Sequence, residues 1–136
     1  MKLIDQCCTL EQGKRLVELG VTAESTFWWM PAKSGPHKEY VQYGNSSDSL
    51  APAYNVAELG ELLPHPSGLN ELGGWVHMTE YDLTPKDGKP WYCLWEYDLD
   101  MDAGGFGRHI IDAVTEAQAR ADMLIYLLEN QIIKPC

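Results

Sequence analysis

The sequence lacks the segments that mark membrane-spanning and exported proteins. It contains no run of about 18 or more apolar residues, the length that predicts a transmembrane helix. The opening residues Met1-Lys2-Leu3-Ile4-Asp5 do not lead into the apolar core of a signal peptide. A chain of 136 residues, 45% of them hydrophobic, can bury a core of its own. We therefore expect one globular domain over residues 1–136, in the cytoplasm and not attached to a membrane.

The motifs of common catalytic sites are missing as well. The sequence contains no Walker loop, no Gly-x-Gly-x-x-Gly fingerprint and no Gly-x-Ser-x-Gly elbow. Its glycine-rich stretch, Gly104-Gly105-Phe106-Gly107, precedes a strand-like run rather than a helix, which favours a hairpin turn. We expect a protein that is not an enzyme and that binds no cofactor.

The cysteines lack the spacing of a metal site. Cys7 and Cys8 are adjacent, Cys93 and Cys136 stand alone, and there is no Cys-x-x-Cys pair. In a cytoplasmic protein this pattern predicts reduced thiols, with Cys93 packed as a small hydrophobic residue.

Three acidic residues match the first ligand positions of a calcium-binding loop: Asp98, Asp100 and Asp102. The match then fails, because the glycine position holds Ala103 and the closing glutamate position holds His109. Alternating acidic residues are also typical of a solvated strand face. We therefore expect no metal site here.

The histidines are dispersed along the chain. His37 and His65 stand beside prolines, and His77 is predicted to be a core residue opposite Tyr97. A catalytic site would need two of the histidine and cysteine side chains in contact, and the predicted register keeps His77 and Cys93 apart.

Positive charge is scarce, since ten basic residues oppose twenty acidic ones and leave a net charge of −10. Residues 80–102 alone hold seven acidic and two basic side chains. A body of this charge repels phosphate groups, so we expect neither a nucleic acid nor an anionic membrane as partner. The charge permits a basic protein partner.

Three helices are predicted from their caps, Thr9, Asn55 and Thr115, each followed three residues later by Gln or Glu. Gly20, Pro64 and Pro135 mark their ends. Apolar spacing predicts these inner faces: Leu10, Leu16 and Val17; Leu59, Leu62 and Leu63; and Ala117, Ala121, Leu124, Leu128 and Ile132.

Strand-like runs lie at 25–30, 39–43, 75–83, 91–99 and 108–114, and residues 44–52 are predicted to form a loop. The turn around Gly88 allows two registers, with either Leu83 or Thr84 opposite Trp91. We expect the Leu83 register, because it places Tyr81 and Leu83 on one buried face with Trp91, Cys93 and Trp95. The order of elements predicts an α+β fold: an antiparallel sheet of about five strands with a long C-terminal helix and two shorter helices packed on it.

Five tryptophans stand among the fourteen aromatic residues. Tryptophan is favoured where proteins meet, and a core of this size is not expected to hide all five. Trp28 and Trp29 are adjacent in a predicted strand, so their side chains point to opposite faces. We therefore expect one of this pair at an interface or at the rim of a pocket.

Three segments carry a resemblance: residues 55–64 (NVAELGELLP), 115–130 (TEAQARADMLIYLLEN) and 16–21 (LVELGV). The sequence resembles a group of short proteins from bacteria, phages and other mobile elements, to which no activity is attached. The resemblance implies a bacterial or phage origin. It implies no functional residues.

We expect a small module that binds protein, either another protein or a second copy of itself. Three features favour this function: abundant tryptophan, a helix that is apolar over a wide arc, and the lack of a catalytic motif. Two alternatives stay open. The acid-rich stretch 96–102 is compatible with an acidic inhibitor or DNA-mimic protein of a mobile element. An enzyme with an unrecognised site would bring two histidine or cysteine side chains together.

Overall fold

The computed structural model describes residues 2–33, 38–63, 74–81, 88–100 and 105–135, with the backbone alone in 74–81, 96–100 and 105–108. Its helices are the 3-10 turn η1 (Leu3–Gln6) and the α-helices α1 (Leu10–Glu18), α2 (Val56–Leu62) and α3 (Glu116–Glu129). Its strands are β1 (Phe27–Met30), β2 (Tyr40–Tyr43), β3 (Ala51–Pro52), β4 (Gly74–Tyr81), β5 (Trp91–Asp100) and β6 (Gly105–Ala113). The α+β class predicted from the sequence is confirmed. None of the described helices is long and apolar enough to cross a membrane.

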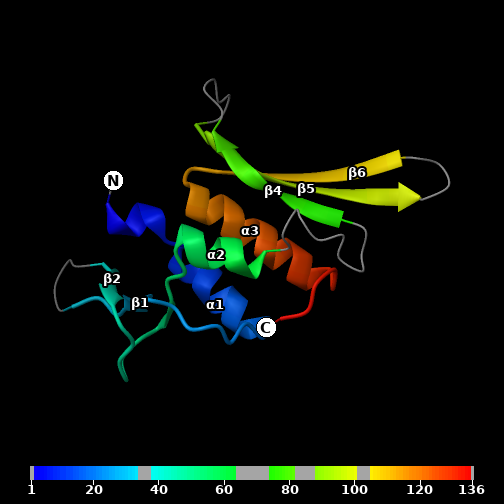
Figure 1. Ribbon diagram of the computed structural model, residues 1–136. Helices are drawn as coiled ribbons and strands as arrows, with labels where there is room; N and C mark the ends of the chain where they lie inside the picture. The colour runs from blue at the N-terminus through cyan, green and yellow to red at the C-terminus, as the bar shows by residue number, and fades with distance from the viewer. Residues whose placement is uncertain (1, 34–37, 64–73, 82–87, 101–104, 136) are drawn as a thin grey trace.

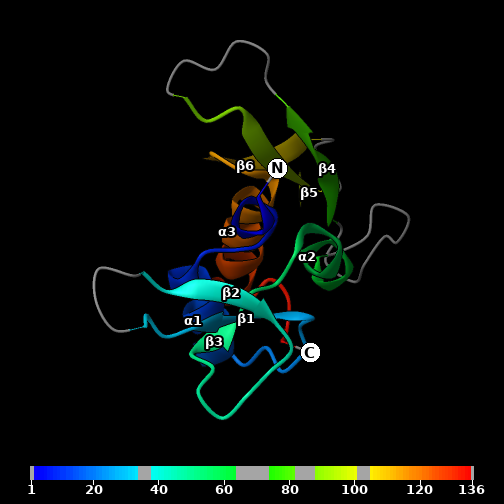
Figure 2. The ribbon, with the colours of Figure 1, turned by 90° about the vertical axis from the view of Figure 1, so that its left-hand side faces the viewer.

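The strands form two separate antiparallel sheets with the helices between them (Figure 1). The larger sheet has the order β4-β5-β6, and the smaller has the order β2-β1-β3. Helix α3 packs under β5 and β6, α1 and α2 pack against α3, and the small sheet lies beyond α1 (Figure 2). The expectation of one sheet of about five strands is therefore wrong.

One strand of the small sheet, β3, lies in the segment 44–52 that was predicted to be a loop. Ala51 pairs with Trp29, and Pro52 pairs with Trp28, so β1 has a strand on each side. β1 is therefore the central strand of the small sheet. The two residues of β3 are too short a run to give a strand pattern in the sequence.

The three α-helices begin at the predicted caps. The Thr9 hydroxyl accepts from the Gln12 amide at 3.1 Å, and the Gln12 side chain accepts from the Thr9 amide at 2.9 Å. Asn55 and Glu58 form the same reciprocal pair at 2.9 and 3.0 Å. The Thr115 hydroxyl accepts from the Gln118 amide at 3.2 Å. These bonds satisfy amide groups that the first turn of a helix leaves unpaired.

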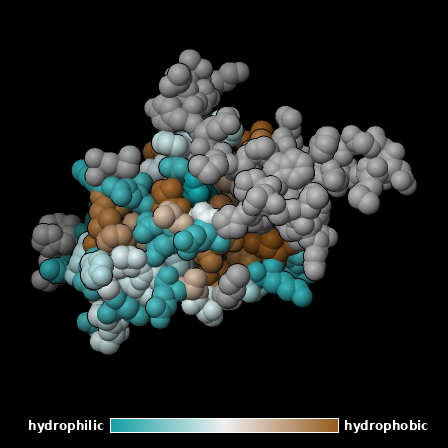
Figure 3. All heavy atoms as spheres, in the orientation of Figure 1, coloured by the Kyte–Doolittle hydropathy of each residue, from teal (hydrophilic) through white to brown (hydrophobic). Residues whose placement is uncertain are grey.

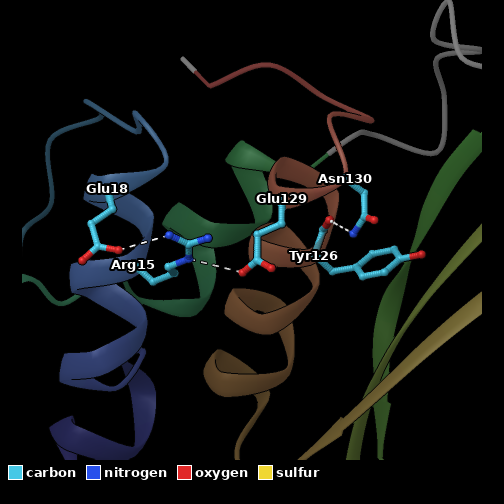
Figure 4. A network of polar contacts seen from close by, with 5 residues as sticks. All are labelled: Arg15, Glu18, Tyr126, Glu129 and Asn130. Atoms are coloured by element: carbon cyan, nitrogen blue, oxygen red, sulfur yellow. Dashed lines mark hydrogen bonds and ion pairs between the residues drawn. The ribbon is translucent and has the colours of Figure 1, made fainter.

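Two details of the helices differ from the prediction. Val17 is 51% exposed, and the buried face of α1 consists of Gln12, Gly13 and Leu16. Helix α3 ends at Glu129, where the Asn130 side chain donates to the Tyr126 carbonyl at 2.8 Å (Figure 4), so Ile132 lies beyond the helix. Neither detail follows from the apolar spacing alone.

The hairpin of β4 and β5 has neither of the two predicted registers. Tyr81 lies opposite Trp91, while Leu83 and Thr84 fall outside the described residues. A bulge between His77 and Glu80 then places His77 opposite Leu94 rather than Tyr97. Nothing in the sequence pattern marks the bulge.

Burial along β5 follows the predicted alternation. Cys93 and Trp95 are buried, and Tyr92 and Leu94 on the other face are only partly buried. The main core joins this face of the sheet to α3, whose buried side chains include the predicted Ala117, Ala121, Leu124 and Leu128. Alanines in the first half of α3 allow its neighbours to approach closely.

Replacement of Leu124 tests this core. Leu124 is 2% exposed, so Leu124→Ala leaves a cavity and should lower the free energy of unfolding by about 2–5 kcal/mol. Thr115→Ala removes one capping bond and should cost about 1 kcal/mol. Urea unfolding measures both, and a Leu124→Ala variant as stable as the wild type would show that this face of α3 is not the core face.

Replacement of Gly13 tests the contact between α1 and β3. A Cβ at Gly13 would overlap the carbonyl oxygen of Pro52. In a free helix Gly→Ala gains about 1 kcal/mol, but here the overlap should reverse the sign and cost about 1–3 kcal/mol. Lys14→Ala, at the exposed neighbouring position, is the control and should change stability by less than about 0.5 kcal/mol. A stabilised Gly13→Ala variant would mean that α1 and β3 do not touch.

Candidate functional site

The two tryptophans predicted at an interface lie on β1 with different surroundings. Trp28 is partly buried and donates its indole N–H to the Ser25 carbonyl at 3.0 Å. Trp29 is 6% exposed and donates to the Cys8 carbonyl at 3.1 Å. Contact of either tryptophan with a partner protein stays a prediction. Trp29 does, however, line a hollow at the surface of the protein.

This hollow, which we call the Trp29 hollow, has a volume of about 360 Å³. It lies between η1, the start of α1, β1 and the residues just before β2, and its lining is Ile4, Asp5, Cys7, Thr9, Leu10, Glu11, Trp29, Lys38, Glu39 and Gln118. Trp29, Cys7 and Ala53 form a small buried cluster, with Leu10 packed against it. The hollow therefore has an apolar floor.

The apolar surface continues outward from the hollow over η1. Ile4, which lines the hollow, is 44% exposed, and its neighbour Leu3 is exposed too. Figure 3 shows apolar side chains gathered over this end of the molecule. An apolar side chain of another molecule could therefore bury area both in the hollow and on η1.

The rim of the Trp29 hollow carries a surplus of negative charge. Asp5, Glu11 and Glu39 supply three carboxylates, and Lys38 supplies the one ammonium group among the lining residues. Charged groups of one sign around a concave surface raise the local concentration of oppositely charged ligands. The rim thus favours a cationic ligand over an anionic one.

Gln12 fixes one wall of the hollow by joining α1 to α3. Its buried side-chain amide donates to the Gln118 carbonyl at 3.1 Å and to the Asp122 carboxylate at 2.6 Å. Burial raises the pKa of Asp122, although the hydrogen bond from Gln12 and the charge of Lys89 act in the opposite direction. The sequence showed Gln12 only as a capping residue, so this second role was missed.

A second link between α1 and α3 lies at the far end of the helices (Figure 4). The Arg15 guanidinium donates to Glu18 at 3.1 Å and to Glu129 at 3.3 Å. All three side chains are exposed, so solvent screens this network and it stabilises the pair of helices less than Gln12 does.

Glu58 holds β1, and with it Trp29, against α2. Besides capping α2, its carboxylate accepts from the Thr26 amide at 2.8 Å and from the hydroxyls of Ser25 and Thr26 at 3.1 Å each. One carboxylate thus satisfies donors from both segments, and the strand that carries Trp29 begins at a fixed place.

A second hollow of about 670 Å³ lies at the starts of α2 and α3. It is lined in part by Arg120, which is 9% exposed and donates to Glu116 at 3.1 Å. The guanidinium lies against α2 at Gly60, where a Cβ would be 2.5 Å from its Nη1 atom. Glu116 compensates the charge of Arg120, so this hollow has no net charge to attract a ligand. The sequence signal for this ion pair is the spacing: Glu116 stands four residues before Arg120, which lies among apolar residues of the helix.

Three cysteines and one histidine that could contribute to an enzyme site have described side chains: Cys7, Cys8, Cys93 and His109. Cys7, Cys8 and Cys93 are buried, which confirms the packing predicted for Cys93. Burial raises the pKa of Cys7 to about 11 and that of Cys8 to about 12, so both thiols are protonated near neutral pH and are poor nucleophiles. His109 stacks on the Tyr126 ring with centroids 3.6 Å apart, and burial lowers its pKa.

Several residues singled out in the sequence cannot be placed in a site. His37, His65 and Asp102 lie outside the described residues, and His77, Asp98 and Asp100 belong to strands whose backbone alone is described there. Within the described part of the chain, no group of three His, Cys, Asp or Glu side chains is arranged to hold a metal ion. The acid-rich stretch 96–102 therefore stays a sequence prediction.

Comparison with known proteins gives no family for the chain: no family model matches it, and no curated protein or solved structure is similar to it. The resemblance of residues 55–64 and 115–130 to short bacterial and phage proteins stays a prediction. The Trp29 hollow is thus the basis on which a function can be inferred.

The raised pKa of Asp122 predicts a dependence of stability on pH. Because the folded state raises this pKa, ionised Asp122 opposes folding above it, and the cost disappears as the pH falls below the usual aspartate value of about 4. Asp122→Asn keeps the acceptor for Gln12 and removes the charge. We expect a higher urea midpoint than the wild type at pH 7 and a gap that closes on acidification.

Asp48→Asn is the control. It changes the net charge of the protein by the same amount, but Asp48 is exposed in a turn and has no buried hydrogen-bond partner among the described residues. At pH 7 the urea midpoint of Asp122→Asn should be higher than that of Asp48→Asn. A lower midpoint than the wild type at pH 7 would show that the ionised carboxylate contributes more through Gln12 and Lys89 than it loses by burial.

Proposed function

We propose that the chain is a small protein-binding module, and that the Trp29 hollow holds an apolar side chain of the partner while basic residues of that partner lie beside the acidic rim. One observation carries this proposal: the lining of the hollow combines the apolar side chains of Ile4, Leu10 and Trp29 with the carboxylates of Asp5, Glu11 and Glu39. In line with the sequence resemblance, we place the activity in the cytoplasm of a bacterium or of a phage-infected cell.

A protein partner fits this surface better than a small molecule does. The apolar surface extends from the hollow over Leu3 and Ile4, beyond the reach of a ligand that fills the hollow alone. Interfaces between proteins commonly have an apolar centre and a polar rim, and a few buried side chains supply most of the binding energy. The net charge of −10 favours a basic partner further.

Selection from a random peptide library against the full chain tests the proposal. We expect the enriched peptides to combine an aliphatic or aromatic residue with Lys or Arg on either side, and their affinity to fall as salt is added. In fluorescence anisotropy titrations, Ile4→Lys should weaken binding of such a peptide about tenfold or more, because it places a cation on the apolar surface (about 1.4 kcal/mol).

Two control variants make the test specific. Val17→Lys adds the same charge at a comparably exposed apolar residue outside the hollow, and it should bind as the wild type does. Glu11→Gln and Glu39→Gln should each weaken binding more than Glu24→Gln, which removes an exposed acid elsewhere. The proposal is wrong if no peptide is enriched, if the enriched peptides are acidic, or if Ile4→Lys binds them as tightly as Val17→Lys does.

A further inference from the structure

Strand β6 forms an edge of the larger sheet, and the described residues place no strand on its other side. It pairs with β5 from Gly105 to Ala113. His109 stacks on Tyr126 of α3, and Ala113 is buried, so the odd-numbered positions from 109 onward face the core. Ile110 and Asp112 alternate with them and are exposed, Ile110 to 55%. An edge of this kind offers unpaired backbone N–H and C=O groups to another strand.

The outward positions of β6 are complementary to themselves in an antiparallel pair. Positions 108, 110 and 112 hold Arg, Ile and Asp, so the charges are opposite in sign and equally spaced on either side of an apolar centre. When two copies of β6 pair with Ile110 opposite Ile110, Arg108 of each copy lies opposite Asp112 of the other. Opposite charges and apolar residues at facing positions stabilise antiparallel strands.

We infer that the β6 edge binds a second copy of this chain, so that two three-stranded sheets join into one antiparallel sheet around a two-fold axis at Ile110. A second copy is the occupant because the charges on this edge match each other. In the register of the sheet, position 108 also lies opposite position 96 of β5, which holds a glutamate. The two-fold axis is perpendicular to the sheet, which keeps both copies of α3 on the same face.

This surface differs from the Trp29 hollow, which is built by η1, α1 and β1. The net charge of −10 on each copy opposes the association. At physiological ionic strength the charges on the distant parts of the two bodies are screened beyond about 8 Å, whereas facing positions of paired strands are closer together than that. The pairing is therefore tested at that ionic strength.

Charge exchange in the full chain tests this register. Sedimentation equilibrium should give about twice the mass of the 15.3 kDa chain for the wild type. Asp112→Arg places arginine opposite arginine in both pairs, and Arg108→Asp places aspartate opposite aspartate, so each variant alone should dissociate at least about tenfold more readily. An equimolar mixture of the two variants should restore the dimer, because every facing pair in the mixed dimer is complementary.

Asp48→Arg is the matched control, since it changes the net charge equally in an exposed turn away from β6. It should dimerise at least as well as the wild type, because it lowers the repulsion between the two bodies. A monomeric wild type, an Asp112→Arg dimer as stable as the Asp48→Arg dimer, or a mixture that stays monomeric would each overturn the inference.

Disulfide trapping tests the centre of the pair without altering a charge. In a Cys136→Ser background, Ile110→Cys places two thiols opposite each other on the two-fold axis, and mild oxidation should link the copies covalently. Val17→Cys, at a comparably exposed position on α1, should not form this link. Equal cross-linking of both variants, or of neither, would contradict the register even if a charge variant failed to fold.

Discussion

The burial of α3 is the constraint on which the other elements depend. Eight of its fourteen residues are buried, so it must be covered on several sides. The larger sheet covers one side, and α1 and α2 cover the others, which leaves the small sheet to pack on α1 rather than on α3. The start of α3 also lies beside η1, so the surface around η1 takes its shape from the same helix. A change in the position of α3 would therefore move both sheets and the Trp29 hollow together.

Buried polar side chains decide how the helices meet, because apolar contacts alone allow several arrangements. Gln12, which is buried, joins α1 to α3, and the partly buried Glu58 joins α2 to the strand of Trp29, while Arg120, paired with Glu116 of its own helix, lies against α2 at Gly60. Each of these groups would be costly to bury without its partner. An alternative packing of the same elements would lose the bonds of Gln12 and Glu58, so these polar contacts favour one arrangement among the compact ones.

The sequence predicted the elements that depend on neighbours along the chain. The caps at Thr9, Asn55 and Thr115, the buried leucines of α3 and the alternation of β5 all follow from spacing. What it did not predict depends on contacts between distant segments. The two residues of β3 form a strand only because β1 lies beside them. The bulge between His77 and Glu80 shifts the register of β4 against β5, and no sequence pattern predicts it.

The sequence likewise predicted only the local part of the Trp29 hollow. The adjacent tryptophans identified β1 as a strand with two different faces, and Trp29 does line a hollow. The carboxylates on its rim come from three segments, η1, α1 and the residues before β2, and no spacing rule connects them. Their surplus of charge was visible only as part of the total of −10, which does not say where on the surface it gathers.

The two proposed surfaces lie in different layers of the fold, so occupying one does not block the other. The Trp29 hollow belongs to the small sheet and the helices beside it, whereas β6 is the edge of the larger sheet. A pair joined through β6 would carry two hollows at a fixed separation. A partner with two basic and apolar segments could then bind both, and its second contact would form within one complex at a high effective concentration. Such linkage raises affinity by roughly a hundredfold or more without a new contact, so self-association through β6 would strengthen the binding of such a partner beyond what one hollow provides.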